Sequence, residues 1–182
     1  VIVAVVAVVS SLPLPNREKP EARPRGEERK LTLGVWREKR TLLIALIGFS
    51  FIMAEISAGT WVAIALTGSG FSGSAAAIAF GLFWVVITIG RVFGGFVVES
   101  IGRYRTILLS AIITAVGILI FMLADVIALP LLGLVLWGLG MSMGFPMAVS
   151  AMSDDPKRAP FRINMIITVV YISSITVGPV LG

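Results

Sequence analysis

Long apolar runs separated by short polar segments dominate the pattern of this chain. Residues 41–66, for example, carry a single charge, Glu55. At about 1.5 Å per helical residue, a run of this length crosses a hydrocarbon core of about 30 Å with some tilt. The runs expected to span a membrane are 41–66, 75–98, 106–124, 128–152 and 163–182. The pattern therefore predicts an all-α, polytopic helical membrane protein.

The chain begins and ends inside apolar sequence. Residues 1–15 open on a run of Val, Ile and Ala that Pro13 and Pro15 interrupt. Because proline removes an amide donor and restricts the residue before it, we interpret this segment as the end of a transmembrane helix. The run 163–182 stays uncharged to its last residue. We expect both ends to be cuts through membrane helices, with 41–182 forming one transmembrane unit.

The segment 16–40 is a charged linker, with nine basic and five acidic residues. Pro20, Pro24 and Gly26 predict disorder in its first half. Its second half, Leu31 to Trp36, is expected to lie at the membrane interface as a short amphipathic piece.

Basic residues are distributed unevenly among the polar segments. The linker, the turn 99–105 and the loop 153–162 together hold 14 of the 15 Lys and Arg residues, while the loops 67–74 and around Asp125 hold none. Since positive loops remain on the cytoplasmic side, the linker and both basic turns are expected to be cytoplasmic. The predicted location is the cytoplasmic membrane, crossed several times.

Composition excludes several classes of protein. Hydrophobic residues make up 57% and charged residues 14%, against about 25% charged residues in soluble domains. The net charge of +5 comes from basic residues in the loops between spans, so we interpret it as setting the orientation in the membrane rather than as a sign of nucleic-acid binding. The chain has no Cys and no His, and we find no phosphate loop, nucleophile–base pair or metal-ligand set. We expect no enzyme activity, cofactor, metal or nucleic-acid partner.

One polar turn carries a motif. The segment 91–105 reads RVFGGFVVESIGRYR, and the spacing Gly-x-x-x-acid-x-x-Gly-Arg is formed by Gly95, Glu99, Gly102 and Arg103. A first glycine permits close helix approach, a second lets the chain reverse, and the acid can face a helix N-terminus or an arginine. The motif resembles the signature loop of the major facilitator superfamily. That family usually has Asp at 99 and basic residues at 100 and 104, so a basic turn fixed only by topology remains the alternative.

The resemblance extends to the order of the segments. In that superfamily a cytoplasmic linker separates two six-helix halves, and the signature loop joins the second and third helices of a half. Gly178, Pro179 and Gly182 match the Gly-Pro-x-x-Gly of the fifth helix of each half. The resemblance implies that the chain runs from the end of helix six to most of helix eleven. An N-terminal six-helix half of the same protein would be its partner.

The resemblance also implies a function. The protein would be a secondary active transporter that moves an unidentified small solute across the lipid bilayer by alternating access. Arg91, Gly95, Glu99, Gly102 and Arg103 would belong to the gating loop. A polytopic channel or a scaffold without transport coupling is the alternative, although no polar stripe or re-entrant filter is found.

Glu55 is the main candidate for chemistry because a charge near the middle of a span costs a few kcal/mol on insertion scales. One interpretation is a protonatable carboxylate that couples transport to protons or contacts the substrate; the other is a structural glutamate hydrogen-bonded to a neighbouring helix. Thr60 and Trp61 are candidate neighbours, and Trp61 is equally suited to anchor the helix at the outer interface.

Arg91 is the second charge inside a span, with three open roles. Its side chain can extend to the headgroups, pair with an acid elsewhere, or contact the signature loop. Arg91 lies about 12 Å and Glu55 about 21 Å from the cytoplasmic ends of their helices. This difference of about 9 Å in depth argues against an Arg91–Glu55 pair. Gly90 and Gly94 form a G-x-x-x-G pair expected to serve helix packing.

Overall fold

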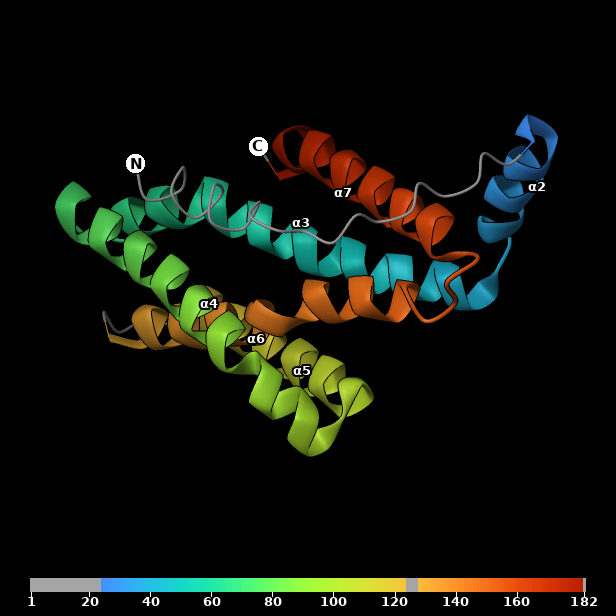
Figure 1. The fold of residues 1–182 in the computed structure, drawn as a ribbon. Helices are drawn as coiled ribbons and strands as arrows, with labels where there is room; N and C mark the ends of the chain where they lie inside the picture. The colour runs from blue at the N-terminus through green and yellow to red at the C-terminus, as the bar shows by residue number, and fades with distance from the viewer. Residues whose placement is uncertain (1–23, 124–127, 182) are drawn as a thin grey trace, which may run out of the picture. The chain divides into compact units, whose positions relative to one another are not determined.

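The computed structural model describes residues 24–123 and 128–181. It contains six helices in this part of the chain (Figure 1): α2 Arg25–Val35, α3 Lys39–Gly68, α4 Gly73–Ile101, α5 Arg103–Leu123, α6 Ala128–Met152 and α7 Ala159–Leu181. Five of them, α3 to α7, are long and apolar enough to cross a membrane. The predicted class, an all-α polytopic membrane protein, is confirmed. The predicted helix end at residues 1–15 and position 182 lie outside the described residues.

The chain divides into two units, Val1–Lys30 and Leu31–Gly182, and the five long helices belong to the second. The predicted disorder of the first half of the linker is wrong for residues 25–30, which form the start of α2. The carbonyl oxygen of Pro24 accepts hydrogen bonds from the amides of Glu27 and Glu28 at 2.9 and 3.2 Å. Both glutamates also place negative charge in the first helical turn, where the helix dipole favours it.

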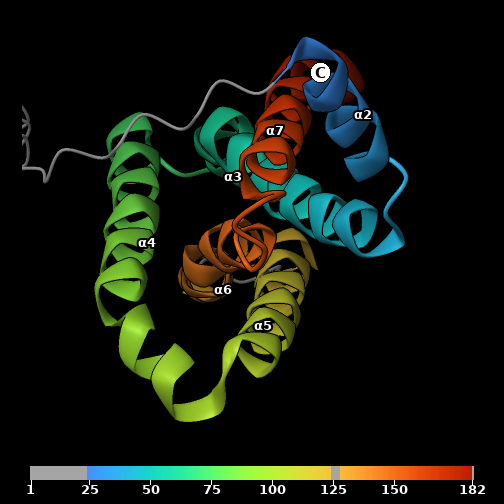
Figure 2. The same cartoon turned by 45° about the vertical axis from the view of Figure 1, so that its right-hand side comes forward.

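Helix α6 is the centre of the second unit. It packs against α3, α4 and α5, and 56% of its apolar window is buried, against 22–28% in the other four long helices. Figure 2 shows α6 enclosed by its neighbours. The helix continues through Pro146. An apolar helix buried on most sides explains why its sequence shows no polar face.

Glycines allow α5 and α6 to approach backbone to backbone. A Cβ at Gly117 would lie 2.8 Å from the carbonyl oxygen of Gly133, and a Cβ at Gly133 would lie 2.8 Å from that of Gly117. Gly140 makes the same kind of approach to the Ser110 carbonyl oxygen, at 2.8 Å. Close backbone contacts of this kind stabilise helix pairs in lipid, where the hydrophobic effect does not drive helices together.

A single residue joins α4 to α5. Gly102 follows Ile101 directly and precedes Arg103, with φ 80° and ψ 160°. This conformation is essentially restricted to glycine, because a Cβ would clash with the backbone. Gly102 thus reverses the chain between α4 and α5, as expected, through a backbone conformation that glycine allows (Figure 1).

Replacing Gly102 with alanine is expected to lower the free energy of unfolding of the complete protein by about 2 kcal/mol, because alanine would be strained at this φ. The free energy is measured by titrating the detergent-solubilised protein with SDS. Gly81→Ala is the matched control, since Gly81 lies inside α4 and a Cβ there meets nothing within 4 Å in the part of the chain that the structure describes. Equal stability of the two variants would contradict the prediction.

Candidate functional site

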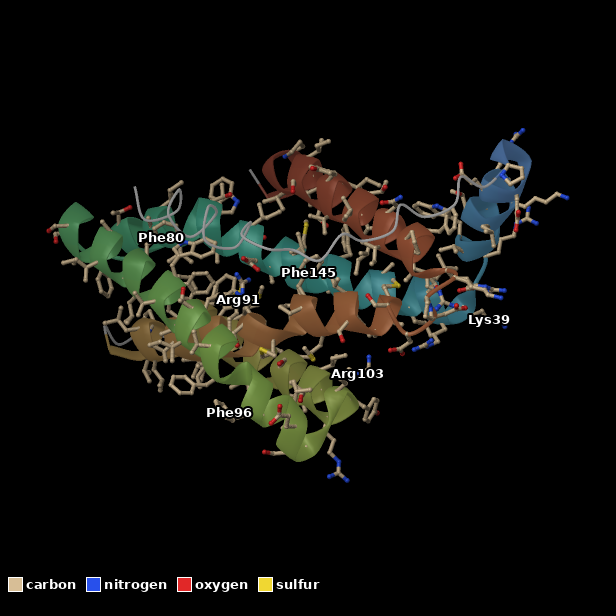
Figure 3. The ribbon with its side chains drawn as sticks, viewed as in Figure 1. Lys39, Phe80, Arg91, Phe96, Arg103 and Phe145 are labelled. Carbon is tan, nitrogen blue, oxygen red and sulfur yellow. The ribbon has the colours of Figure 1, made fainter. Side chains whose placement is uncertain are left out.

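Glu55 of α3 and Arg91 of α4 form an ion pair between the two helices. Arg91 Nη2 donates to both carboxylate oxygens of Glu55, at 3.2 Å each. The Glu55 side chain is 15% exposed and that of Arg91 43% exposed. The expectation that these two residues do not pair is therefore wrong. Figure 3 labels the side chain of Arg91 on α4.

The direction of the side chains explains the pair. Helical side chains lean toward the N-terminus of their own helix, and α3 and α4 run in opposite directions. Arg91 therefore leans away from the end of the bundle where the linker enters, and Glu55 leans toward that end. The two side chains supply five methylene groups between them. The backbone positions of Glu55 and Arg91 differ in depth by about 9 Å, and the two side chains together are long enough to bridge this difference.

A cavity of about 370 Å³ lies beside the pair. Its walls come from α3, α4 and α7, and consist of Ile52, Glu55, Ile56, Gly59, Thr60, Trp84 and Val170. Glu55 and Thr60, which the sequence analysis named as candidate neighbours, line the same cavity. Trp61 does not line it, and its indole nitrogen is buried without a hydrogen-bond partner among the described residues. The hydroxyl of Thr60 donates to the carbonyl oxygen of Ile56 at 2.9 Å, so its oxygen remains available only as an acceptor.

Trp84 is the aromatic wall of the cavity, which the sequence analysis missed. Its ring meets Phe80 and Phe83 edge to face, with centroids 6.2 and 5.7 Å apart. Phe83 is fully buried and contacts Trp137 in the same manner, at 5.7 Å. These contacts fix the ring orientation of Trp84. The sequence spacing could have identified Trp84, because it precedes Arg91 by two helical turns and therefore lies on the same face of α4.

A charged network lies at the end of the bundle where the linker enters. Asp154 accepts from Arg103 at 2.7 Å and from Arg40 at 2.6 Å. It therefore connects the start of α5, the start of α3 and the loop after α6. The hydrogen bonds from Arg103 and then Arg40 hold the pKa of Asp154 below its ordinary value. Arg103, expected in the gating loop, is thus engaged, whereas Glu99 is exposed and forms no ion pair within the described residues.

Glu38 is the centre of a second set of ion pairs at the same end. Its Oε2 accepts from Arg162 Nε and Nη2 at 3.0 and 2.8 Å, and Arg158 donates to Oε1. The hydroxyl of Thr41 also donates to this carboxylate, at 2.7 Å. The Thr41 hydrogen bond and those from the two arginines outweigh burial and lower the pKa of Glu38 from 4.5 to about 2. This set joins the N-terminus of α3 to the start of α7.

The glycines expected to serve packing divide into two groups. A Cβ at Gly90 or Gly94 would collide with Ser142 or Met143 of α6, so this pair lies against that helix. A Cβ at Gly95 or Gly178 would meet nothing within 4 Å in the part of the chain that the structure describes. The close approach expected at Gly95 is therefore not made within this part. Pro179 lies inside α7, and Gly182 is outside the described residues.

Comparison with known proteins agrees with this architecture. The family model of the major facilitator superfamily matches residues 1–179. An uncharacterized MFS-type transporter of Yersinia pestis is 28% identical over 155 residues, which cover 85% of this chain and 40% of that protein. The chain thus spans about two fifths of the length of this relative. No solved structure matches the chain. With five helices long and apolar enough to cross a membrane and a family-model match over nearly its full length, the chain belongs to the major facilitator superfamily.

Proposed function

We propose that the complete protein is a secondary active transporter that moves a small solute across the cytoplasmic membrane by alternating access, with the Glu55 cavity forming one wall of the solute site. The observation that carries the proposal is the Glu55–Arg91 ion pair beside a cavity in the middle of the helices. Charged side chains at this depth are expensive and generally belong to substrate or ion pathways. The other wall would come from an N-terminal six-helix half.

Proton coupling at Glu55 is part of this proposal. Arg91 of α4 is the charged side chain that faces the Glu55 carboxylate. The stretches 106–123, 128–152 and 163–181 of the neighbouring helices contain no Asp, Glu, Lys or Arg, and Tyr171 is their one titratable side chain. Protonation of Glu55 would therefore remove the partner of Arg91, with no second acid on these stretches to replace it. Such a loss would bias the bundle toward another arrangement.

The charged network at the linker end would act as the cytoplasmic gate. Asp154 holds Arg40 and Arg103 together, and so ties α3 to the α4–α5 turn. In an alternating-access cycle such contacts form when one side closes and break when it opens. This role also requires the linker and the basic turns to be cytoplasmic, as the distribution of Lys and Arg indicates.

The test uses the complete protein in sided proteoliposomes with a transmembrane pH gradient. Uptake from a panel of radiolabelled cationic, neutral and anionic solutes identifies a transported compound. Glu55→Gln is expected to abolish the stimulation of uptake by the gradient, while Glu27→Gln, which removes the same charge from the exposed α2, retains it. Gradient-driven uptake that survives Glu55→Gln would reject proton coupling at this residue. Uncoupled conduction of ions would instead favour a channel.

A further inference from the structure

We propose that the Glu55 cavity selects a monovalent organic cation with an apolar, aromatic body, and that Arg91 is an internal competitor for the same carboxylate. This inference rests on the proposed transport function and adds the class of substrate to it. It follows from the donors and acceptors of the cavity wall, from the geometry of the ion pair, and from the fixed ring of Trp84.

The cavity wall offers acceptors and few donors. Its polar side-chain oxygens are the Glu55 carboxylate and the Thr60 hydroxyl, whose hydrogen is already donated to Ile56. Among the described residues that line the cavity, the only free side-chain donor is the indole nitrogen of Trp84, and Arg91 is not one of them. A sugar or polyol needs many paired donors and acceptors, because unpaired hydroxyls are costly once they leave water. The carboxylate of Glu55 would repel an anion. A cation with an apolar body fits the wall best.

The ion pair has the geometry of a replaceable contact. Arg91 uses one nitrogen for both oxygens, at 3.2 Å, whereas charge-assisted hydrogen bonds are usually about 2.8 Å long. Arg162 in the same protein binds Glu38 through two nitrogens at 2.8 and 3.0 Å. Arg91 is also 43% exposed, so packing among the described residues leaves its side chain room to move away from the carboxylate. A ligand cation can therefore take its place.

Trp84 provides the aromatic contribution. A cation within about 6 Å of an indole ring is attracted by its quadrupole, and the attraction grows in a desolvated site. Phe80 and Phe83 hold the ring in place, so little conformational entropy is lost on binding. The ring lies over Gly59, where a Cβ would be 3.9 Å from an indole carbon. Glu55 and Trp84 thus offer a carboxylate and a ring to one ligand.

The test compares phenyltrimethylammonium with tert-butylbenzene, which has the same shape without the charge. Binding of each to the complete protein in nanodiscs is measured by isothermal titration calorimetry. We expect the cation to bind at least about tenfold more tightly, since a tenfold difference requires only about 1.4 kcal/mol. Glu55→Gln should remove this preference and Trp84→Leu should weaken cation binding by roughly tenfold. Glu27→Gln should change neither.

The variant Arg91→Gln distinguishes competition between Arg91 and the ligand for Glu55 from a loss of binding caused by misfolding. If Arg91 competes with the ligand, its removal should tighten cation binding by roughly fivefold or more, which a misfolded variant cannot do. Arg105→Gln, an exposed arginine without an ion pair among the described residues, is the matched control. Weaker cation binding by Arg91→Gln, or equal affinity of the unaltered protein for the two probes, would overturn the proposal. In that case, gradient-driven uptake of an anionic or neutral solute would still support transport, so the two failures are distinguishable.

Discussion

Replacing Glu38 with glutamine is expected to lower the free energy of unfolding of the complete protein by about 3 kcal/mol at neutral pH. Arg162 is only 7% exposed, and it loses its carboxylate partner in this variant. Its Nη1 is already buried without a hydrogen-bond partner among the described residues. A buried guanidinium with no counter-charge is strongly destabilising. SDS titration of the protein in mixed micelles measures the difference.

The effect of Glu38 should also depend on pH in a defined direction. The pKa of Glu38 falls from 4.5 to about 2 on folding, so the unfolded state binds the proton first as the pH decreases. The stabilisation is therefore fully present above about pH 4.5 and is lost as the pH falls toward 2. The gap between the unaltered protein and Glu38→Gln should be constant from pH 7 to 5 and should narrow below that range.

Two variants control this prediction. Glu27→Gln neutralises an exposed glutamate of α2 and should alter stability by less than about 0.5 kcal/mol. The double variant Glu38→Gln with Arg162→Gln removes both charges, and should recover part of the loss because no buried charge is left unpaired. A gap that does not narrow in acid would show that the carboxylate acts through packing rather than through charge.

Replacing Gly133 with leucine is expected to lower the free energy of unfolding by about 3 kcal/mol, the upper part of the usual range for overpacking. A Cβ at this position would lie 2.9 Å from Phe121 Cα and 2.8 Å from the Gly117 carbonyl oxygen. These are backbone atoms of α5, which cannot rotate away as a flexible side chain would. The two helices would have to separate, with loss of their contacts along the whole interface.

Gly81→Leu is the matched control for this substitution. Gly81 lies in α4, and a Cβ there meets nothing within 4 Å among the described residues, so the same side chain meets no backbone of a neighbouring helix in this part of the chain. SDS titration and the yield of monodisperse protein after size-exclusion chromatography compare the two variants. A difference of less than about 0.5 kcal/mol, the usual effect of a surface substitution, would contradict the packing argument.

The helices were predictable because bilayer thickness limits the length of an apolar run. The ends of the helices were less predictable, since helical hydrogen bonding continues into the polar residues that flank each apolar run. Helix α3 already begins at Lys39, and α4 includes Glu99 and Ser100 before it stops at Gly102. Polarity marks where a membrane ends, whereas the φ of Gly102 marks where the helix ends.

The candidate site was only partly predictable. Glu55 and Arg91 stand out because each is the one charge in its apolar run, but their contact depends on side-chain direction. Trp84 lies among other large apolar residues, and nothing local distinguishes it from a packing residue. The network at the linker end joins Arg40 to Asp154 and Glu38 to Arg162, 114 and 124 residues apart. Contacts over such separations follow from the tertiary fold, which no short motif encodes.

The one-residue connection at Gly102 has a mechanical consequence. Two helices joined by a single residue cannot separate at that end, and α5 is held to α6 by the close backbone approaches at Gly117 and Gly133. We expect α4, α5 and α6 to turn as one rigid block, and α3 to pivot against it together with α7, its other main packing partner. The Glu55–Arg91 pair crosses the seam between these two bodies. A change in the charge of either residue therefore acts directly on the contact between the two bodies.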